Sequence, residues 1–267
     1  MPHVLLLTLF ACKAPDPAPT EIEELSRFFI NHYEDEEPQA LADGANNLDL
    51  WYQDNVGEGD LGGLLDDLLL EDIVGIGMPQ DTDPDLMVGV FHLTPQQCSL
   101  DDIAGIFLYD DQQELFPDSY ITYGREYKTD TECFRPGDCD DAHWDINIKT
   151  ALALGTEMTY TLDSGMVRTR PDADGDTFTE PFLMSRTWLP EPAEVDGVGY
   201  FDQSYQIEVF LPTGSDTTLH FYALWNAGGV DGLDPEADFW KDQYLDSIIE
   251  WDERIDELCA EPALWQG

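Results

Sequence analysis

The sequence predicts an α+β protein, and three observations support that class. After residue 85, most segments have apolar residues at every second position, which is the period of half-buried strands. A long stretch near the C-terminus instead has apolar residues at steps of three and four, the period of an amphipathic helix. Shorter stretches with the helical period precede residue 80. Strands and helices are therefore segregated along the chain, as in α+β proteins.

The first eleven residues have the features of an export signal. The apolar run Val4–Ala11 is far shorter than the ~20 residues that span a bilayer, but it suits the apolar region of a secretory signal. The run ends in Leu9-Phe10-Ala11-Cys12, which resembles a bacterial lipobox. This resemblance implies that residues 1–11 are removed and that Cys12 receives acyl chains such as palmitate, which anchor the protein in a membrane. The alternative is a mis-started N-terminus, because Met1-Pro2-His3 contains no Lys or Arg.

A tether and three helices are predicted between the signal and the strands. Residues 12–20 are rich in proline and indicate an extended spacer. Residues 21–79 form a predicted helical segment, and Thr20 and Glu23 have the spacing of a capping box for its first helix. The expected second and third helices run from Pro38 through Trp51 and from about Asp60 to Ile73. We expect these helices to form a small cap or arm, with the leucines of the third helix as packing surface.

Seven strands are predicted between residues 85 and 225. Turn-forming residues such as Gly155 and Pro212-Thr213-Gly214 separate most of them. Two short helices follow the first strand, one from Ser99 or Asp101 through Tyr109 and one over Gln112 to Phe116. The expected strands are Leu86–Leu93, Tyr120–Tyr127, Trp144–Leu154, Glu157–Arg168, Phe182–Leu189, Tyr200–Leu211 and Thr218–Trp225.

The clearest predicted helix closes the chain. Asp234 is its expected N-cap, and Pro235 fits the first helical position. Its apolar face is wide and must pack against other elements. The residues of that face are Trp240, Tyr244, Ile248, Trp251, Ile255 and Leu258.

The order of one strand, two short helices, six strands and a long C-terminal helix resembles the START-like (SRPBCC) helix-grip superfamily. That group includes lipid-transfer domains, plant pathogenesis-related allergens and polyketide cyclase-like proteins. The resemblance covers about residues 85–261 and concerns element order, not a sequence motif. It implies a curved antiparallel sheet of about seven strands that grips the last helix, with an apolar cavity between them, in a domain spanning 80–261. The helical segment and the loop 133–139 depart from the minimal domain, and either could narrow the cavity mouth.

The charge of the chain excludes nucleic acid as a partner. Fifty-seven acidic residues stand against 11 Lys and Arg, and the formal net charge is -46. Such a field repels phosphate backbones and anionic lipid headgroups. It also keeps an exported, tethered protein soluble, so the composition agrees with export.

Four cysteines remain after Cys12, an even number that favours disulfides in an oxidising compartment. Three pairings are possible. Cys133 and Cys139 bracket a Pro-Gly loop and could close it locally, which would leave Cys98 to pair with Cys259. We favour this pairing over the other two.

Strand parity indicates which residues face the expected interior. The apolar faces are formed by Trp144, Ile146, Ile148, Leu152 and Leu154, by Met158, Tyr160 and Leu162, and by Tyr205, Ile207, Val209 and Leu211. Arg186 shares an apolar face with Phe182, Met184 and Trp188, so it needs a carboxylate partner or an acidic ligand head. His220 and Tyr222 fit core or rim positions better than a catalytic pair. The candidate ligand contacts are Tyr160, Arg186, Trp188, His220, Tyr222 and Trp251.

No motif in the sequence predicts a cofactor. The five histidines lack the spacing of a zinc site, and no nucleophile elbow or phosphate-binding glycine loop is present. Asp172, Asp174 and Asp176 form a weak calcium candidate, since Gly175 and Glu180 do not occupy the positions that an EF-hand requires. An exposed acidic hairpin loop explains the same residues.

Three functions of different classes are compatible with the sequence. The leading one is a lipid-anchored, non-enzymatic exported protein that binds an apolar or lipid-like small molecule. The alternative is a structural or interaction lipoprotein with a filled core, and the third is a cyclase- or hydrolase-like enzyme. Lipoproteins that are retained in the inner membrane often have Asp after the acylated cysteine, and this chain has Lys13 there. We therefore expect a location in the cell envelope, at the outer membrane of a Gram-negative bacterium. The sequence makes no prediction of oligomeric state.

Overall fold

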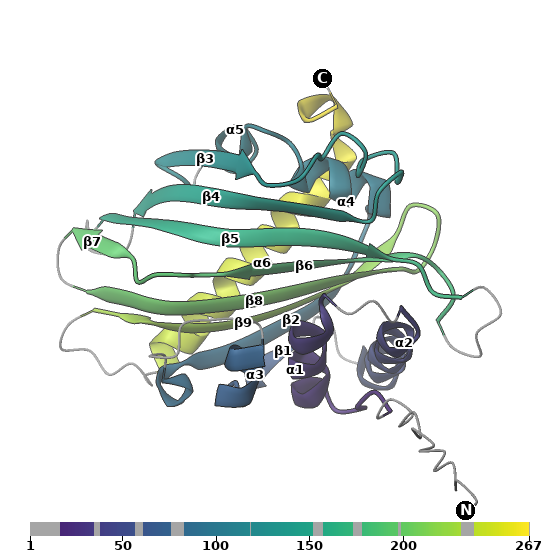
Figure 1. Cartoon of the computed structure of the whole chain (residues 1–267), viewed down its shortest axis with the longest axis horizontal. Helices are drawn as coiled ribbons and strands as arrows, with labels where there is room; N and C mark the ends of the chain where they lie inside the picture. The colour runs from purple at the N-terminus through teal and green to yellow at the C-terminus, as the bar shows by residue number, and fades with distance from the viewer. Residues whose placement is uncertain are drawn as a thin grey trace, which may run out of the picture.

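One antiparallel sheet of nine strands forms the centre of the structure (Figure 1). The computed structural model describes residues 17–34, 38–56, 61–75, 83–117, 119–151, 157–172, 178–196, 199–230 and 238–266. The strand order is β1-β2-β9-β8-β6-β5-β4-β3, and β7 pairs with β5. The strands are β1 (Leu61–Leu65), β2 (Val88–Gln96), β3 (Thr122–Tyr127), β4 (Asp141–Ala151), β5 (Glu157–Thr169), β6 (Phe182–Trp188), β7 (Glu194–Asp196), β8 (Tyr200–Pro212) and β9 (Thr218–Gly229).

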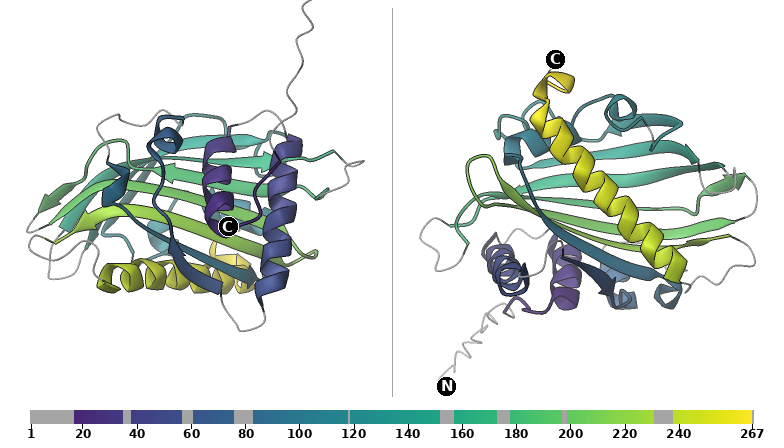
Figure 2. Two further views of the ribbon diagram at one scale, coloured as in Figure 1. Left: turned by 90° about the horizontal axis from the view of Figure 1, so that it is seen from below. Right: turned by 180° about the vertical axis from the view of Figure 1, so that it is seen from behind.

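Helices cover both faces of this curved sheet. The long helix α6 crosses one face, and α1 and α2 lie against the other (Figures 1 and 2). The predicted α+β class, with a sheet gripping a long C-terminal helix, is therefore confirmed. In the described part of the chain, no helix is both long and apolar enough to cross a membrane. The helices are α1 (Ile22–His32), α2 (Pro38–Asn55), α3 (Leu70–Gly75), α4 (Leu100–Phe107), α5 (Gln112–Leu115) and α6 (Asp238–Ala260).

The two faces of the sheet bury different parts of the chain. We call the side covered by α6 the α6 face and the opposite side the α1 face. On β8, Ile207 and Val209 pack with α1, whereas Phe210 packs with α4 and α6, and all three are fully buried. The prediction that Tyr205, Ile207, Val209 and Leu211 face the last helix is therefore wrong. Both faces of β8 are covered, so its more apolar side could belong to either layer.

The N-terminal helices are part of the main core. Leu25, Phe29 and Ile30 of α1 are fully buried in a cluster that includes the α1 face of β6, β8 and β9. The predicted small cap or arm is therefore a core layer instead, and the helices α1 and α2 do not narrow the cavity mouth, because they pack on the opposite side of the sheet. The predicted capping box is also absent, since the N-cap of α1 is Glu21 and no side chain caps it.

The predicted third helix is instead a strand followed by a short helix. β1 pairs with β2 from Leu61 opposite Leu93 to Leu65 opposite Gly89. Gly62 and Gly63 each disfavour a helix by about 1 kcal/mol relative to Ala, and an edge of the sheet is available to them. The leucine stripe packs only in part, because Leu65 and Leu68 are buried and Leu64 and Leu69 are exposed.

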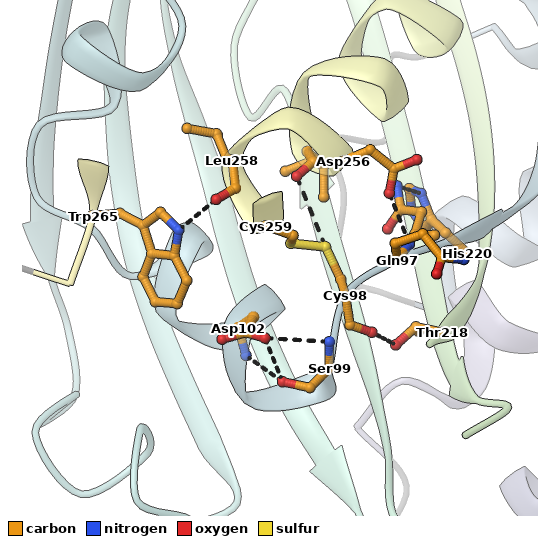
Figure 3. Close-up of a disulfide and its surroundings, with 12 residues drawn as sticks. Gln97, Cys98, Ser99, Asp102, Thr218, His220, Asp256, Leu258, Cys259 and Trp265 are labelled. Carbon is orange, nitrogen blue, oxygen red and sulfur yellow. Dashed lines mark hydrogen bonds between the residues drawn. A yellow bond between two sulfur atoms is a disulfide. The ribbon is translucent and has the colours of Figure 1, made fainter. Parts of the chain in front are cut away.

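Two disulfides are present, with the predicted pairing. Cys98 joins Cys259 with 5.5 Å between Cα atoms, and Cys133 joins Cys139 with 5.4 Å. Figure 3 shows that the first bond links α6 to the start of α4.

Hydrogen bonds strengthen the junction around the first disulfide. The backbone N of Gln97 donates to Asp256 at 2.9 Å, and the Thr218 hydroxyl donates to the Cys98 carbonyl at 2.6 Å (Figure 3). Ser99 caps α4 by accepting from the backbone N of Asp102 at 3.1 Å. The C-terminal end of α6 is thus fixed to the β2–α4 junction and to β9.

Candidate functional site

The structure contains a cavity of about 170 Å³ between the α6 face and the helices α4, α5 and α6. An apolar cavity of about 150 Å³ holds a benzene molecule, whereas sites for drug-sized ligands start near ~300 Å³. The cavity therefore fits a single ring or a short chain. It is lined by Phe107, Gln112, Tyr120, Tyr123, Arg125, Trp144, Ile146, Ile148, Tyr160, Leu162, Ser164, Thr187, Gln206, Glu208, Tyr222 and Trp251.

A larger groove of about 680 Å³ lies over β4, β5 and the segment before β7. It is open to solvent and is lined mainly by polar side chains such as Asn147, Thr159 and Thr161. These polar residues of β4 and β5 alternate with the cavity residues along their strands, so they point to the other side of the sheet. Ile148 and Tyr160 line both the groove and the cavity. We therefore take the smaller, more enclosed cavity as the candidate site.

Trp251 of α6 forms part of the cavity wall next to solvent. Its ring stacks on Phe116 with centroids 4.0 Å apart and meets Phe107 edge-on at 6.1 Å. The same Trp251 side chain also lines an outer groove with Phe116 and Arg254. Trp251 thus separates the cavity from this groove. This position agrees with the prediction that Trp251 belongs to the apolar face of the last helix.

A buried polar network lies beside the cavity. Asp252 of α6 has its two carboxylate oxygens 2.5 Å from Nδ1 of His92 and 2.5 Å from Nδ1 of His220. Gln96 donates to the same Asp252 carboxylate at 2.9 Å. The histidines come from the neighbouring strands β2 and β9 and are buried, as is Asp252. The α6 face therefore brings these groups together under the last helix.

The network reaches the cavity through Glu208. His220 Nε2 lies 3.3 Å from Oε2 of Glu208, and the His220 ring stacks on Phe210 with centroids 4.2 Å apart. Glu208 is only 4% exposed, and its side chain lines the cavity. Asp252, His220 and Glu208 thus form a continuous series from α6 to the cavity wall.

Burial and charge together set the protonation of this series. Burial disfavours a charge on His220, but the carboxylates of Asp252 and Glu208 outweigh it and raise the pKa of His220 to about 9. Burial also opposes the charge on Asp252, yet His220 and His92 hold the pKa of Asp252 below its usual value. For Glu208, burial is the larger effect and raises its pKa, although His220 opposes it. At neutral pH, His220 is therefore an imidazolium next to the Asp252 carboxylate.

Arg125 occupies the wall at the β3 edge of the sheet. Its guanidinium donates to the Phe107 carbonyl at 2.6 Å and to the Tyr123 hydroxyl at 2.7 Å. It also lies over the Trp144 ring, 4.8 Å from the centroid. Phe107 is the last residue of α4, so Arg125 binds the negative end of that helix. Among the described residues, no carboxylate forms an ion pair with it.

Three buried polar atoms of cavity residues have no hydrogen-bond partner in the described part of the chain. They are Nε1 of Trp144, Oε2 of Glu208 and Nε1 of Trp251. Buried polar atoms are nearly always paired in folded proteins, and an unpaired one costs about 1–3 kcal/mol. A bound molecule with its own donor and acceptor would satisfy them.

Two of the predicted ligand contacts lie away from the cavity. Arg186 and Trp188 are on the α1 face, where Arg186 is 2% exposed and forms an ion pair with Glu34. The Arg186 guanidinium also lies over the rings of Tyr33 and Trp188, at 4.5 and 5.1 Å. The carboxylate partner that an inward Arg needs is therefore supplied by the protein, and α1 covers the face that strand parity assigned to the ligand.

The other four predicted contacts are at or next to the cavity. Tyr160, Tyr222 and Trp251 line it, and His220 contacts its wall residue Glu208. Strand parity alone did not single out Glu208, because it belongs to the more polar side of β8. Arg125 shares its side of β3 with Tyr123 and Tyr127, but no face of that strand was assigned from the sequence. Of the calcium candidates, Asp174 and Asp176 lie outside the described residues, as does Cys12. Within the described ranges, no group of His, Cys, Asp and Glu side chains is arranged to hold a metal ion.

Comparison with known proteins adds a likeness of fold. No protein-family profile and no curated protein sequence matches the chain. Among solved structures, the lipid transfer and protein localization domain of human StarD13 has 9% identity and a TM-score of 0.45, over 76% of this chain and 85% of that one. A START superfamily protein from Mycobacterium smegmatis has 12% identity and a TM-score of 0.41, over 66% and 97%. A STAR-related lipid transfer protein from Xanthomonas axonopodis has 10% identity and a TM-score of 0.40, over 79% and 93%.

Proposed function

We propose that this protein is a non-enzymatic binding protein that holds one small molecule in the cavity under α6. The observation that carries the proposal is a partly enclosed, ring-lined cavity of about 170 Å³, whose wall residues have buried donors and an acceptor without a hydrogen-bond partner among the described residues. Its apolar walls fit an apolar body, and its unpaired atoms fit one polar group. The volume restricts a lipid-like ligand to a short chain or a single ring, since a long acyl chain needs more space.

We further propose that the protein acts at a membrane, to which Cys12 anchors it. The support is the lipobox-like sequence before Cys12 and the proline-rich spacer after it, which would hold the domain away from the bilayer. On this proposal, the site of action is the cell envelope, and Lys13 favours the outer membrane of a Gram-negative bacterium. A single acyl chain binds a membrane only marginally, whereas two or three bind it stably.

Filling the cavity tests the binding function. Leu162→Phe places a larger apolar side chain in the cavity, so it should abolish binding of a single-ring probe such as benzyl alcohol without lowering stability. Leu86→Phe is the control, because Leu86 is 55% exposed. Calorimetric titration of the probe measures the effect. If the unchanged protein binds no single-ring probe and releases no small molecule on denaturing extraction, the protein is a filled structural domain.

Removing the acylated thiol tests the anchor. Cys12→Ala should move the protein from the membrane fraction to the soluble exported fraction and abolish incorporation of labelled fatty acid. Lys13→Ala keeps the lipobox-like sequence and should stay acylated. A Cys12→Ala protein that remains in the membrane fraction would contradict the anchor.

An acid–base enzyme is the second candidate, and one observation favours it. Glu208 borders the cavity and can exchange a proton with His220, which Asp252 orients. Such a group could move a proton between two atoms of one bound molecule. A bound compound that is recovered unchanged, with no exchange of its carbon-bound hydrogens in deuterated water, would leave the binding function alone.

A further inference from the structure

The acceptor Glu208 sets the chemical character of the cavity. Its Oε2 atom is buried and has no hydrogen-bond partner in the described part of the chain, although His220 Nε2 lies 3.3 Å away. His220 is shared by two carboxylates, because Asp252 contacts its other ring nitrogen at 2.5 Å. His220 therefore stands between two carboxyl groups, and the carboxyl group of Glu208 is the one at the cavity wall. A cation in the cavity would stabilise the carboxylate form of Glu208, which burial disfavours.

Aromatic rings surround the same part of the cavity. Tyr120, Tyr160, Tyr222 and Trp251 all line it. The faces of such rings attract cations, because the ring quadrupole is negative there. Buried carboxylate and ring faces together therefore favour a positively charged group.

We propose that the cavity selects a small organic cation, a protonated primary amine on a single ring or short apolar body, and that Glu208 accepts a hydrogen bond from its ammonium group. This inference rests on the binding function proposed above and adds the class of ligand. An ammonium group would supply a donor to the buried Oε2 atom of Glu208 and a positive charge beside its carboxylate. The net charge of -46 also raises the local concentration of cations around the protein.

Arg125 does not reverse this preference. Its guanidinium is bound to the Phe107 carbonyl and the Tyr123 hydroxyl and lies over Trp144. It is on β3, four strands from β8 in the sheet order, so it is at the other end of the cavity from Glu208. The apolar side chains of Ile146, Ile148 and Leu162 lie on the strands between them.

Binding of an amine should be coupled to the ionisation of Glu208. The titratable or charged groups around Glu208 are His220 and Tyr222 on β9, Asp252 on α6 and Tyr120 before β3, with the Ser185 hydroxyl on β6. Beyond them, His92 and Asp256 contact or face the Asp252 end of the network. Because burial favours the neutral acid of Glu208 and an ammonium favours its carboxylate, binding below the pKa of Glu208 should release a proton.

Four single-ring probes of nearly equal size test the inference: benzylamine, benzyl alcohol, toluene and benzoate. We expect the purified full chain to bind benzylamine about tenfold to a hundredfold more tightly than toluene, as a hydrogen bond to a charged group implies. Benzyl alcohol should lie between them, and benzoate should bind most weakly. Titrations across pH 5 to 8 in two buffers of different ionisation enthalpy should show proton release with benzylamine that disappears as the pH rises above the pKa of Glu208, and none with toluene at any pH.

Glu208→Gln is the deciding variant, and Glu126→Gln is the matched control. Glu126 is an exposed glutamate beside the cavity strand residue Arg125, and its change should leave all four affinities as they were. Glu208→Gln should bring benzylamine to within about threefold of toluene and abolish proton release. The ratio of the dissociation constants for benzylamine and toluene, measured on one protein sample, does not depend on how much of that sample is folded.

Each outcome has a distinct meaning. If none of the four probes binds, the binding function itself fails. If toluene and benzyl alcohol bind but benzylamine binds no more tightly than toluene, only the assignment of an amine fails. If benzoate binds most tightly, the assignment is overturned, and Arg125 is then the recognising group. If the preference for benzylamine survives in Glu208→Gln, the cation is bound elsewhere, and the role of Glu208 is refuted.

Discussion

The two faces of the sheet are built from alternate residues of the same strands, yet they differ in character. On the α1 face, β6, β8 and β9 present the fully buried residues Met184, Ile207, Val209 and Phe221. On the α6 face, the same strands present Ser185, Thr187, Gln206, Glu208 and His220. Apart from the Arg186–Glu34 ion pair, these strands are apolar on the α1 side, whereas the α6 side contains a buried polar network and a cavity. The comparison teaches that one sheet can place an apolar core on one side and the candidate cavity on the other.

The apolar side also compensates for the polar one. Buried polar groups contribute little net stability even when they are paired, so the polar stretch of β8 and β9 stabilises the α6 face less than the apolar cluster around Trp144, Phe210 and Ile255 does. The α1 face adds a second layer that the helices α1 and α2 close. The N-terminal helices thus add buried apolar area on the side of the sheet away from the cavity.

The largest expected effect concerns the disulfide that fixes α6 over the cavity. Replacing Cys98 and Cys259 by Ala removes a link between residues 161 positions apart, which should lower the free energy of unfolding by about 5 kcal/mol in a chain-entropy estimate. Replacing Cys133 and Cys139, only 6 positions apart, should cost about 2 kcal/mol. Urea unfolding of both variants measures the difference. Equal losses would mean that the long link does not stabilise the cavity side.

The next effect distinguishes the filled face from the cavity face. Phe29→Ala removes a fully buried ring from α1 and should lower the free energy of unfolding by about 3–5 kcal/mol. Because the ring lies on the α1 face, affinity for a single-ring probe should not change in the fraction that remains folded. Phe28→Ala is the control, since the neighbouring Phe28 is only partly buried and should cost less. A loss of probe affinity in Phe29→Ala would show that the two faces are coupled.

The polar network gives the α6 face a dependence on pH. The pKa of His220 is raised to about 9 in the folded protein, so its protonation stabilises the fold fully below its unfolded value of about 6.5. This stabilisation is lost as the pH rises through about 9 and should amount to a few kcal/mol. The lowered pKa of Asp252 has the opposite effect on the free energy of unfolding. The stabilisation by the Asp252 carboxylate is present at neutral pH and is lost as the pH falls below the ordinary pKa of an aspartate.

Glu208 changes stability in the same direction as His220, over a lower range of pH. Its raised pKa means that the folded state binds a proton more tightly, so stability falls as the pH rises from the unfolded value toward the folded one. Thermal melts from pH 5 to pH 10 should therefore show a declining alkaline limb. In His220→Gln, the part of that decline between pH 7 and 9 should disappear. An unchanged limb in this variant would place the titrating group elsewhere.

The smallest expected change in stability tests the wall between the cavity and the outer groove. Trp251 is only half-buried and makes its main contact with Phe116, so Trp251→Ala should cost about 1–2 kcal/mol, less than a core ring. The same change opens the cavity and should weaken binding of benzyl alcohol at least about tenfold. Calorimetry and urea unfolding on one sample compare the two quantities. A loss of about 3–5 kcal/mol with unchanged binding would make Trp251 a core residue.

Much of the fold could be predicted because its signals are local. The period of two in β4, β5, β6, β8 and β9 and the apolar face of α6 were sufficient to find those elements. The disulfide pairing followed from the short loop between Cys133 and Cys139. β1 was missed because five residues with two glycines give neither period clearly, and because an edge strand is defined by its partner. β7, with three residues, is shorter than any usable pattern.

The site was less predictable, since alternation separates two faces without saying which element covers each. Tyr160, Tyr222 and Trp251 were found as apolar or aromatic interior positions, and Arg186 was misplaced because α1, not a ligand, covers its face. A usable signal for Glu208 did exist. Gln206 and Glu208 alternate with apolar residues in the second half of β8, where both sides of the strand are covered. Polar side chains in such a strand must form hydrogen bonds with other buried polar groups.

The pairing of β2 with β9 has a consequence for how the chain is made. Val88 lies opposite Asn226 and Gln96 opposite Thr218, so an early strand receives its partner only after more than a hundred further residues have been synthesised. Pairings between such distant segments form slowly. While the later strands are still on the ribosome or inside a translocation pore, β2 has an unpaired edge and His92 lacks its partner Asp252. Holding factors that delay collapse until α6 has emerged would therefore raise the yield of native protein, and chains that end before α6 should aggregate rather than fold.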